Sequence, residues 1–289
     1  MTVTLEKNDI YSTLTTWLYC HFWQMWAAEQ IGYDACIHWP TGKFLASYED
    51  SNKYAEIPNA YNWYFVQPKT NEVSGNVWLW EQWADPTPVS FMAQPLQVIK
   101  DYYKKNLIFN EETNRRGQLL VDKYGIDFKK TIGITWRGGD IYLESLNGNE
   151  GRKYTPIELY FEWIDKALER IPDARIACTS EEKEILEPLF KRYPQAFLIE
   201  EFIQVPKGFK HNPERVSDVS GYERGLQPAL MVWLFSKCAW LIKNRASTSA
   251  VASWCSDGEI VNINHTERLG FPPHIDGVEF KEQLYPINI

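Results

Sequence analysis

In the second half of the chain, short apolar runs alternate with longer stretches in which apolar residues recur every three or four positions. The apolar runs are rich in β-branched residues and are bounded by polar or turn-forming residues, as is typical of buried strands. They predict strands at residues 132–136, 174–178, 196–199, 239–242 and 259–263. The stretches between them predict helices at residues 155–170, 179–193, 228–235 and 244–254. Strands that alternate with helices in this way indicate a parallel sheet with right-handed crossovers.

The first half of the chain shows the same alternation once, before a stretch of weak periodicity. Residues 11–33 keep the spacing of a helix face and end near Gly32, and residues 35–39 form an apolar run before Pro40. A helix, a tight turn and a strand make the repeating half-unit of an α/β sheet. Residues 41–95 are rich in aromatic, Asn and Pro residues. They predict loops and short strands that either line an acceptor groove or cover a core.

A helical stretch at residues 93–125 and a polar connector at residues 125–130 lead to the strand at residues 132–136. We expect the domain boundary near residue 130, because polar connectors are typical places for chains to divide. The sequence therefore predicts an N-terminal α/β domain over residues 1–130 and a C-terminal α/β domain over residues 131–289, whose tail can return to the first domain.

Composition and charge narrow the class of protein. With 44% hydrophobic positions in 289 residues, the chain can bury one large core or two moderate ones. No apolar run approaches the ~18 residues of a membrane span, and no basic-then-apolar leader begins the chain, so we expect neither a membrane segment nor a signal peptide. The net charge of −8 disfavours a nucleic-acid partner, which needs a basic face.

Cysteine, aromatic and histidine content add further expectations. The 5 cysteines form no Cys-x-x-Cys pair, which disfavours disulfides and zinc and favours a reducing, cytoplasmic location. Most of the 13 tryptophans and 16 tyrosines would fill cores, but aromatic faces also stack on sugar rings, so their number is compatible with a carbohydrate-active protein. His21 and His38 are candidate site residues, although a single histidine in such a setting is more often structural.

The segment directly after the strand at residues 132–136 carries the main candidate chemistry. It reads Arg137-Gly138-Gly139-Asp140. Two glycines after a strand allow a sharp turn and leave backbone N–H groups open to a ligand. An arginine there stays charged and pairs with phosphate oxygens through its fork of donors. The segment therefore predicts a phosphate-binding loop, with an ordinary turn and a surface arginine as the alternative.

A second anion site is predicted at the start of the helix at residues 244–254. Ser247, Thr248 and Ser249 stand there, and the start of a helix combines hydroxyl groups with unpaired amides. A plain N-cap would account for one of these three residues. Residues 179–182 have a capping-box pattern that predicts the start of another helix, and the glycine-containing segment 145–153 predicts a mobile loop.

In their order, these motifs resemble those of the GDP-fucose-dependent fucosyltransferases of the core-fucosylating and nodulation-factor type. That family carries a strand followed by His-Val-Arg-Arg-Gly/Thr-Asp, where residues 135–140 here read Thr-Trp-Arg-Gly-Gly-Asp. Further similar segments are residues 154–160, 175–182, 191–194 and 226–254. The resemblance covers residues 131–260, and in the first half it extends to the fold pattern alone.

The resemblance implies an α/β fold of the GT-B type, in which two Rossmann-like domains with parallel sheets face a cleft. It assigns Arg137 to the diphosphate and the leaving group, and Asp140 to the carboxylate of the motif. The sequence departs from the family in having Thr135 for the histidine, Gly138 for the second arginine, Ser180-Glu181 for an acidic pair and Met231 for an acid in a helix. These departures leave a phosphate grip in place but bear on the identity of the nucleotide and the sugar.

The remaining site residues follow from the resemblance and from the anion motifs. We expect nucleotide-sugar contacts from Arg137, Gly138, Gly139, Thr179, Ser180, Glu181, Ser247, Thr248 and Ser249. A glutamate that relatives carry beyond the motif aspartate points to Glu144 as the catalytic base. Glu150 and Asp140 are alternatives for that role, and Glu144 could equally be a solvated loop carboxylate.

The expected reaction follows from these assignments. The chain has no Asp-x-Asp pair, so we expect transfer without a metal or other cofactor. Fixed donors would stabilise the departing diphosphate instead. We expect an inverting glycosyltransferase that moves fucose from the donor substrate GDP-fucose to a glycan acceptor. The alternatives are a GT-B transferase for another nucleotide sugar and a catalytically inert glycan-binding relative. The sequence determines neither the acceptor nor the oligomeric state.

Overall fold

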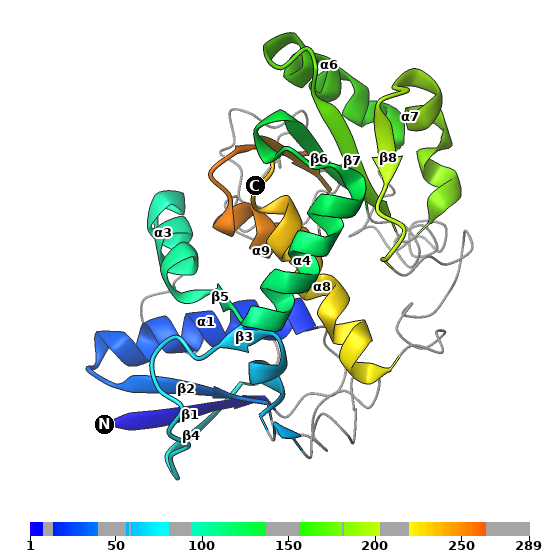
Figure 1. Cartoon of the computed structure of the whole chain (residues 1–289). Coiled ribbons are helices and arrows are strands. Elements are labelled where there is room, and N and C mark those ends of the chain that lie inside the picture. The colour runs from blue at the N-terminus through cyan, green and yellow to red at the C-terminus, as the bar shows by residue number, and fades with distance from the viewer. Residues whose placement is uncertain are drawn as a thin grey trace, which may run out of the picture. The chain divides into compact units, whose positions relative to one another are not determined.

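The computed structural model describes residues 1–7, 14–39, 56–57, 59–80, 94–136, 156–180, 182–202, 220–244 and 246–263. The chain divides into two compact units (Figure 1). Unit 1 comprises Met1–Gln118 and Asp218–Trp233, and unit 2 comprises Leu119–Ser217 and Leu234–Ile289. Two of the three divisions fall within helices, in α4 (Glu111–Tyr124) and α8 (Gly221–Phe235), and the third lies between residues 217 and 218. The predicted cut at residue 130 lies C-terminal of the first division, and a single cut does not include the return of residues 218–233 to unit 1.

Unit 1 contains a three-stranded parallel sheet in the order β2-β1-β4. The strands are β1 (Thr2–Lys7), β2 (Asp34–His38) and β4 (Val77–Trp80), and helix α1 (Leu14–Gln30) connects the first two. The sequence pattern predicts α1 and β2. It misses β1, although the strand alternates polar and apolar residues from Thr2 to Glu6.

The remaining described elements of unit 1 are three helical segments and three short elements. The helical segments are α3 (Leu96–Asn106), the first part of α4 and residues 221–233 of α8, and the short elements are η2 (Ala60–Trp63), β3 (Phe65–Val66) and β5 (Ile108–Phe109). The helical stretch predicted at residues 93–125 consists of two helices, because β5 separates α3 from α4. The side chain of Asn110 accepts a hydrogen bond from the amide of Thr113 at 2.9 Å, so α4 begins with its own cap.

The core of unit 1 is largely aromatic. Trp39 is 1% exposed, and its ring centroid lies 5.7 Å from that of Trp17 in α1 and 5.1 Å from that of Tyr61. Trp63, Tyr64 and Phe65 are also buried. Of the two interpretations left open for residues 41–95, this run of aromatic residues therefore follows the second and packs in a core.

Unit 2 contains a five-stranded parallel sheet in the order β10-β9-β6-β7-β8. Figure 1 labels three of its strands, β6, β7 and β8. Its strands are β6 (Thr131–Trp136), β7 (Arg175–Ser180), β8 (Ala196–Leu198), β9 (Trp240–Lys243) and β10 (Glu259–Asn262). Its helices and helical turns are η4 (Phe128–Lys130), η5 (Ile157–Tyr160), α6 (Phe161–Arg170), η6 (Lys183–Leu186), α7 (Glu187–Arg192) and α9 (Ser247–Cys255). All predicted strands of this half are confirmed, as is their parallel pairing.

Strand β6 is the centre of this unit and is buried at every position. Ile132, Ile134 and Trp136 belong to one core cluster together with residues of α6 and α7. On the other face, a Cβ atom at Gly133 would lie 2.6 Å from the ring of Phe235. Glycine is therefore required at this position for α8 to pack against the strand.

Two helix starts in this half differ from the prediction. The capping box predicted at residues 179–182 is wrong, because Thr179 and Ser180 pair with β6 and extend β7. The next turn, η6, has Glu182 at its N-cap without a side-chain cap bond. Helix α8 begins at Gly221 and holds Pro228 inside it, so the predicted start at residue 228 is wrong. Burial of Tyr222 and Leu226 stabilises the additional turns.

Candidate functional site

The carboxyl edge of the unit 2 sheet is the candidate site. The chain runs from β6 to β7 and β8 on one side and then crosses to β9 and β10 on the other. The strand order therefore reverses between β6 and β9, and open α/β sheets bind ligands outside the carboxyl ends of their strands at such a point. Trp136, Ser180 and Lys243 are the last residues of β6, β7 and β9, and they mark this edge.

Several predicted site residues lie outside the described residues. These are Arg137, Gly138, Gly139, Asp140, Glu144, Glu150 and Glu181. Their roles stay predictions. In the chain, however, Arg137 follows directly on Trp136, so the predicted phosphate loop is joined to the central strand of the sheet at its carboxyl edge.

Thr179 and Ser180 end β7 at the same edge. Both are 3% exposed, and Thr179 is the register partner of Thr135 in β6. The hydroxyl of Ser180 accepts a hydrogen bond from the amide of Glu182 and donates one to its carbonyl oxygen, both at 3.0 Å. This hydroxyl therefore shapes the turn that leaves the strand. Binding of a nucleotide by Thr179 or Ser180 stays a prediction.

Helix α9 begins near the end of β9, which places its first turn at this edge as well. Its N-cap is Ala246, which has no side-chain acceptor, so the plain N-cap interpretation of the hydroxyl residues is wrong. The hydroxyl of Ser249 is buried and contacts the carbonyl oxygens of Asn244 at 3.0 Å and Ala246 at 3.1 Å. Ser247 and Thr248 are half-buried at the helix start, where an anion would be stabilised.

A row of three buried polar residues lies beside this edge, and the sequence did not predict that they would come together. Thr135 pairs in register with Lys243, and Lys243 pairs with Asn262. Their exposed fractions are 6%, 0% and 0%. Because paired residues of parallel strands project from the same face, the side chains share one strip of the sheet. Within the described part of the chain, the Thr135 hydroxyl and the Asn262 amide have no hydrogen-bond partner.

Buried polar groups without partners are costly and are concentrated at functional sites. One sequence signal could have pointed to this row, namely the lysine that ends the apolar run Trp240-Leu241-Ile242. On the opposite face, the hydroxyl of Tyr160 donates to the carbonyl oxygen of Thr135 at 3.1 Å, and burial raises the pKa of this tyrosine. Tyr160 therefore fixes the backbone at the carboxyl end of β6, just before the predicted loop.

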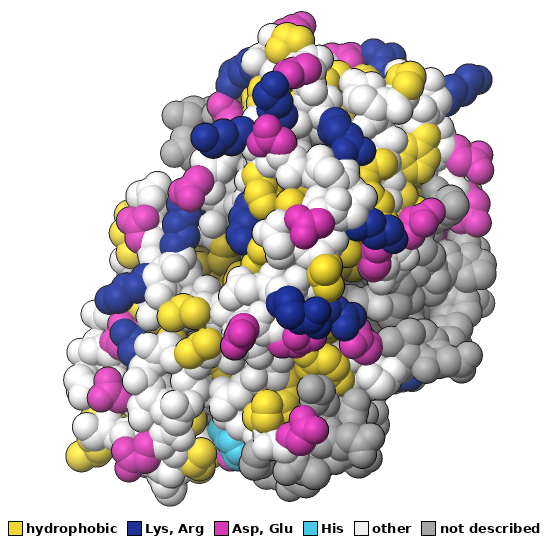
Figure 2. Space-filling view, in the orientation of Figure 1, with side chains coloured by type: hydrophobic (Ala, Val, Ile, Leu, Met, Phe, Trp, Pro, Cys, Tyr) yellow, Lys and Arg dark blue, Asp and Glu magenta, His cyan; other side chains and the backbone are white. Residues whose placement is uncertain are grey.

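The described residues were compared with the features of a metal site, a membrane-spanning helix and a charged surface. Among these, no three His, Cys, Asp or Glu side chains come together as metal ligands would. None of the helices in the described ranges is long and apolar enough to cross a membrane. On the described part of the face in Figure 2, basic and acidic side chains are interspersed. Lys166 and Glu162 of α6 form an exposed pair of opposite charges, and their charged atoms lie 2.7 Å apart.

Two units with parallel α/β sheets, the second of which reverses its strand order at its first strand, define an α/β fold of the GT-B type. No model of a known protein family matches the chain, and no curated protein does either. The solved structures do contain similar folds. A crystal structure of NodZ alpha-1,6-fucosyltransferase soaked with GDP-fucose matches 94% of this chain and 97% of its own, with 13% identity and a TM-score of 0.52.

A second solved structure, fucosyltransferase NodZ from Bradyrhizobium, matches 88% of this chain and 92% of its own, with 13% identity and a TM-score of 0.49. Identity at this level establishes the fold alone. The resemblance to fucosyltransferases that the sequence motifs indicate is thereby confirmed for the fold. It also extends over the first half of the chain, where the sequence showed a similar pattern of elements and no shared motif.

Proposed function

We propose that the protein is an inverting, metal-independent glycosyltransferase that transfers fucose from GDP-fucose to a glycan acceptor. One observation carries the proposal: the fold of a fucosyltransferase soaked with GDP-fucose spans 94% of the chain. Within that fold, the predicted phosphate loop follows the central strand at the edge where such sheets bind nucleotides. The ordered motifs between residues 131 and 260 support the same function independently of the structure.

The proposed reaction requires groups that bind and stabilise the departing diphosphate. Breaking the bond between sugar and phosphate builds negative charge on the diphosphate, and donors fixed in advance stabilise that charge. Arg137 would pair with phosphate oxygens, and the amides of Gly138 and Gly139 would add donors. The first turn of α9, with Ser247 and Thr248, would stabilise the same anion through its N–H groups and its dipole.

A second candidate function is a GT-B transferase for a different nucleotide sugar. The observation that favours it is the state of Ser180, whose hydroxyl is bound to the backbone of Glu182 where the family carries acidic residues. Gly138 in place of the second arginine and Met231 in place of an acid point the same way. The same departures keep a catalytically inert, glycan-binding relative as a further alternative.

Isothermal titration calorimetry of the full chain with GDP, GDP-fucose and a panel of other nucleotide sugars separates these functions. We expect the tightest binding for GDP-fucose, followed by turnover to GDP in the presence of a glycan. Tightest binding of another nucleotide sugar would favour the second candidate. Binding of glycans without binding of any nucleotide would favour the inert relative.

The variant Arg137→Ala tests the phosphate grip itself. Removing a fixed donor to a developing anion typically lowers kcat by about 10²–10³-fold. Lysine at the same position should restore little, because a point charge does not reproduce paired hydrogen bonds. Arg170→Ala is a matched control, since Arg170 makes an exposed ion pair with Glu259 at 2.6 Å and should not affect turnover. Near-normal turnover of Arg137→Ala would refute the assignment.

A further inference from the structure

Three polar side chains of unit 2 form the last row on one face of its sheet before the carboxyl edge. They are Thr135 in β6, Lys243 at the end of β9 and Asn262 at the end of β10, and they are paired in register across the three strands. We call these three residues the polar row. Neighbouring strands lie about 4.8 Å apart, so the polar row spans about 10 Å, which is longer than a single ion.

Two members of the polar row carry buried polar groups that are not paired. No described residue forms a hydrogen bond with the hydroxyl of Thr135 or with either polar atom of the Asn262 amide. The two residues are 6% and 0% exposed. A buried donor or acceptor without a partner costs free energy, and a ligand that pairs with it removes that cost. These groups therefore indicate a binding site at the polar row.

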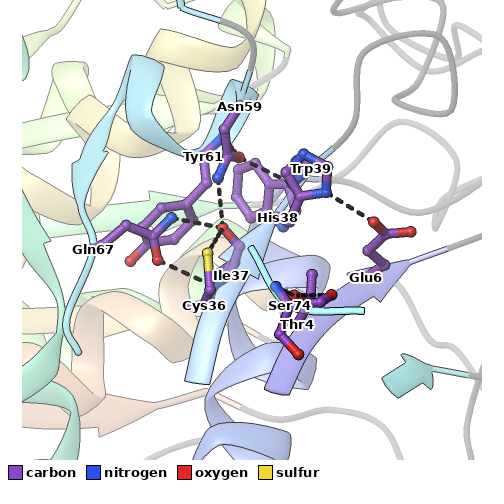
Figure 3. Close-up of polar contacts among 10 residues, drawn as sticks. All are labelled: Thr4, Glu6, Cys36, Ile37, His38, Trp39, Asn59, Tyr61, Gln67 and Ser74. Carbon is purple, nitrogen blue, oxygen red and sulfur yellow. Dashed lines mark hydrogen bonds and ion pairs between the residues drawn. The ribbon is translucent and has the colours of Figure 1, made fainter. Parts of the chain in front are cut away.

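The sheet of unit 1 offers a comparison, because polar side chains near its carboxyl edge bind one another or the backbone (Figure 3). The Nδ1 atom of His38 lies 2.8 Å from the Oε1 atom of Glu6, its register partner. The amide of Gln67 pairs with the peptide group of Ile37, accepting from its nitrogen at 3.0 Å and donating to its oxygen at 2.6 Å. The chain can therefore pair polar side chains at such an edge, and the unpaired groups of the polar row need a separate explanation.

The backbone that carries the polar row is fixed by hydrogen bonds at the ends of the strands. The amide of Asn244 donates to the carbonyl oxygen of Thr135 at 3.4 Å, and the amide of Ile263 donates to that of Lys243 at 2.7 Å. On the other face of β6, the hydroxyl of Tyr160 donates to the same oxygen of Thr135 at 3.1 Å. The three residues are therefore held in register before a ligand arrives, and groups that are fixed in advance stabilise a charge most effectively.

The charge of the polar row favours an anion. Lys243 is 0% exposed, and only three residues separate it from Ser247, the first residue of α9. The hydroxyl of Ser249 donates to the carbonyl oxygen of Asn244 at 3.0 Å, so the first turn of α9 packs against the residue that follows Lys243. The N-terminus of a helix carries partial positive charge, which repels a cation and attracts an anion. A lysine beside it adds repulsion, which an anion bound by both would offset.

We propose, on the basis of the proposed function, that the polar row binds the nucleoside diphosphate of the donor. The ammonium group of Lys243 and the hydroxyl of Thr135 donate to phosphate oxygens, beside the first turn of α9. The amide of Asn262 offers a donor and an acceptor, and a nucleoside diphosphate matches them with phosphate oxygens and ribose hydroxyls. All of these residues belong to unit 2. The polar row thus adds a cation and two neutral groups to the diphosphate contact predicted for Arg137.

Isothermal titration calorimetry of the full chain with inorganic pyrophosphate and with GDP tests the polar row. Lys243→Met, Thr135→Val and Asn262→Leu remove its charge and its polar groups with little change of size. Each variant should raise the Kd for GDP by about 10–100-fold, the range of a hydrogen bond to a charged group. Lys243→Met and Thr135→Val should raise the Kd for pyrophosphate by a similar factor.

Urea unfolding without ligand separates binding from a structural role. No described residue pairs with the Thr135 hydroxyl, so Thr135→Val should leave the unfolding midpoint unchanged or raise it. Thr131→Val is the matched control, because Thr131 lies on the same face of β6 and its hydroxyl donates to the carbonyl oxygen of Asp127 at 2.6 Å. This control should lower the midpoint and keep the Kd for GDP.

A second control concerns the charge. Lys130→Met removes an exposed lysine of unit 2, whose Nζ atom lies 2.5 Å from the Oδ2 atom of Asp173. Surface charges are screened by salt, so this variant should keep the Kd for pyrophosphate while Lys243→Met does not.

Each outcome decides the matter. A wild-type Kd for GDP in any of the three variants of the polar row refutes the proposal, and turnover of GDP-fucose by the wild type then leaves the proposed function standing. An equal loss of stability in Thr135→Val and Thr131→Val also refutes it. If the wild type binds pyrophosphate but not GDP-fucose, the proposed function fails, and the pyrophosphate Kd of Lys243→Met decides whether the row is an anion site. Should Lys243→Met not fold, the Kd of Thr135→Val decides.

Discussion

Gly258→Ala should destabilise unit 2 strongly, because the new methyl group would meet backbone atoms that cannot rotate away. Gly258 lies between α9 and β10. A Cβ atom built there would lie 2.2 Å from the carbonyl oxygen of Cys238 and 2.6 Å from that of Ala239. The carbonyl of Ala239 also accepts the hydrogen bond of the Glu259 amide at 2.9 Å, and this bond aligns β10 with β9. Relief of the overlap must therefore separate these two strands.

The expected cost follows from these two effects. Inserting a methyl group into a packed site costs about 1–3 kcal/mol, and loss of one backbone hydrogen bond adds about 1 kcal/mol. We therefore expect a loss of about 3 kcal/mol in the free energy of unfolding of unit 2. For units of this size, each kcal/mol lowers Tm by about 2–4 °C, which predicts a fall of about 6–12 °C.

Thermal unfolding followed by circular dichroism measures this change, with two matched glycine variants beside it. Gly75→Ala has nothing within 4 Å of its new methyl group, so its Tm should stay close to that of the wild type. Gly32→Ala also has open space, but its φ of 79° is strained for alanine, so a small loss of about 1 kcal/mol is expected. A Tm for Gly258→Ala equal to that of Gly75→Ala would refute the steric reasoning.

Three further predictions concern the requirement for a metal, the dependence of stability on pH and the hydrogen bond of Tyr160. Turnover of GDP-fucose should persist in excess chelator, and a loss restored by Mg²⁺ or Mn²⁺ would contradict the proposed metal-independent grip on the diphosphate. Burial raises the pKa of Cys36 to about 11 and that of Cys238 to about 12, from 9.0. Above pH 9 the unfolded chain therefore releases these protons while the folded chain keeps them, so stability, measured by urea unfolding, should fall as pH rises from 9 towards 11. Tyr160→Phe removes the hydrogen bond to Thr135 and should cost about 1 kcal/mol by the same assay, whereas an unchanged midpoint would show that this bond contributes nothing.

The sequence by itself determined the strands of unit 2 and their parallel direction. Buried strands of parallel sheets are continuous apolar runs, and each of the five is bounded by polar or turn residues that stop it. Such runs are local properties, which a sequence displays directly. The same holds for α1 and β2, and for the motif order that resembles the fucosyltransferases. A helix or a strand was therefore predicted correctly wherever a single hydrophobic pattern corresponded to a single element.

Elements whose bounds depend on residues far away in the chain could not be predicted in this way. Thr179 and Ser180 carry the signature of a helix cap, yet pairing with β6 holds them in a strand. Pro228 looks like a helix start, yet α8 begins earlier because Tyr222 and Leu226 are buried. In both cases the free energy of tertiary packing exceeded a local preference of about 1 kcal/mol.

The candidate sites show the same division. The sequence placed Ser247, Thr248 and Ser249 at the start of a helix, because hydroxyl residues at helix starts follow a local rule. It could not pair Glu6 with His38, since these residues are brought together only when β1 and β2 adopt one register. A contact between residues far apart in the chain depends on which strands pair and in what alignment. That choice is made by burial across the whole sheet, and no local pattern of residues records it.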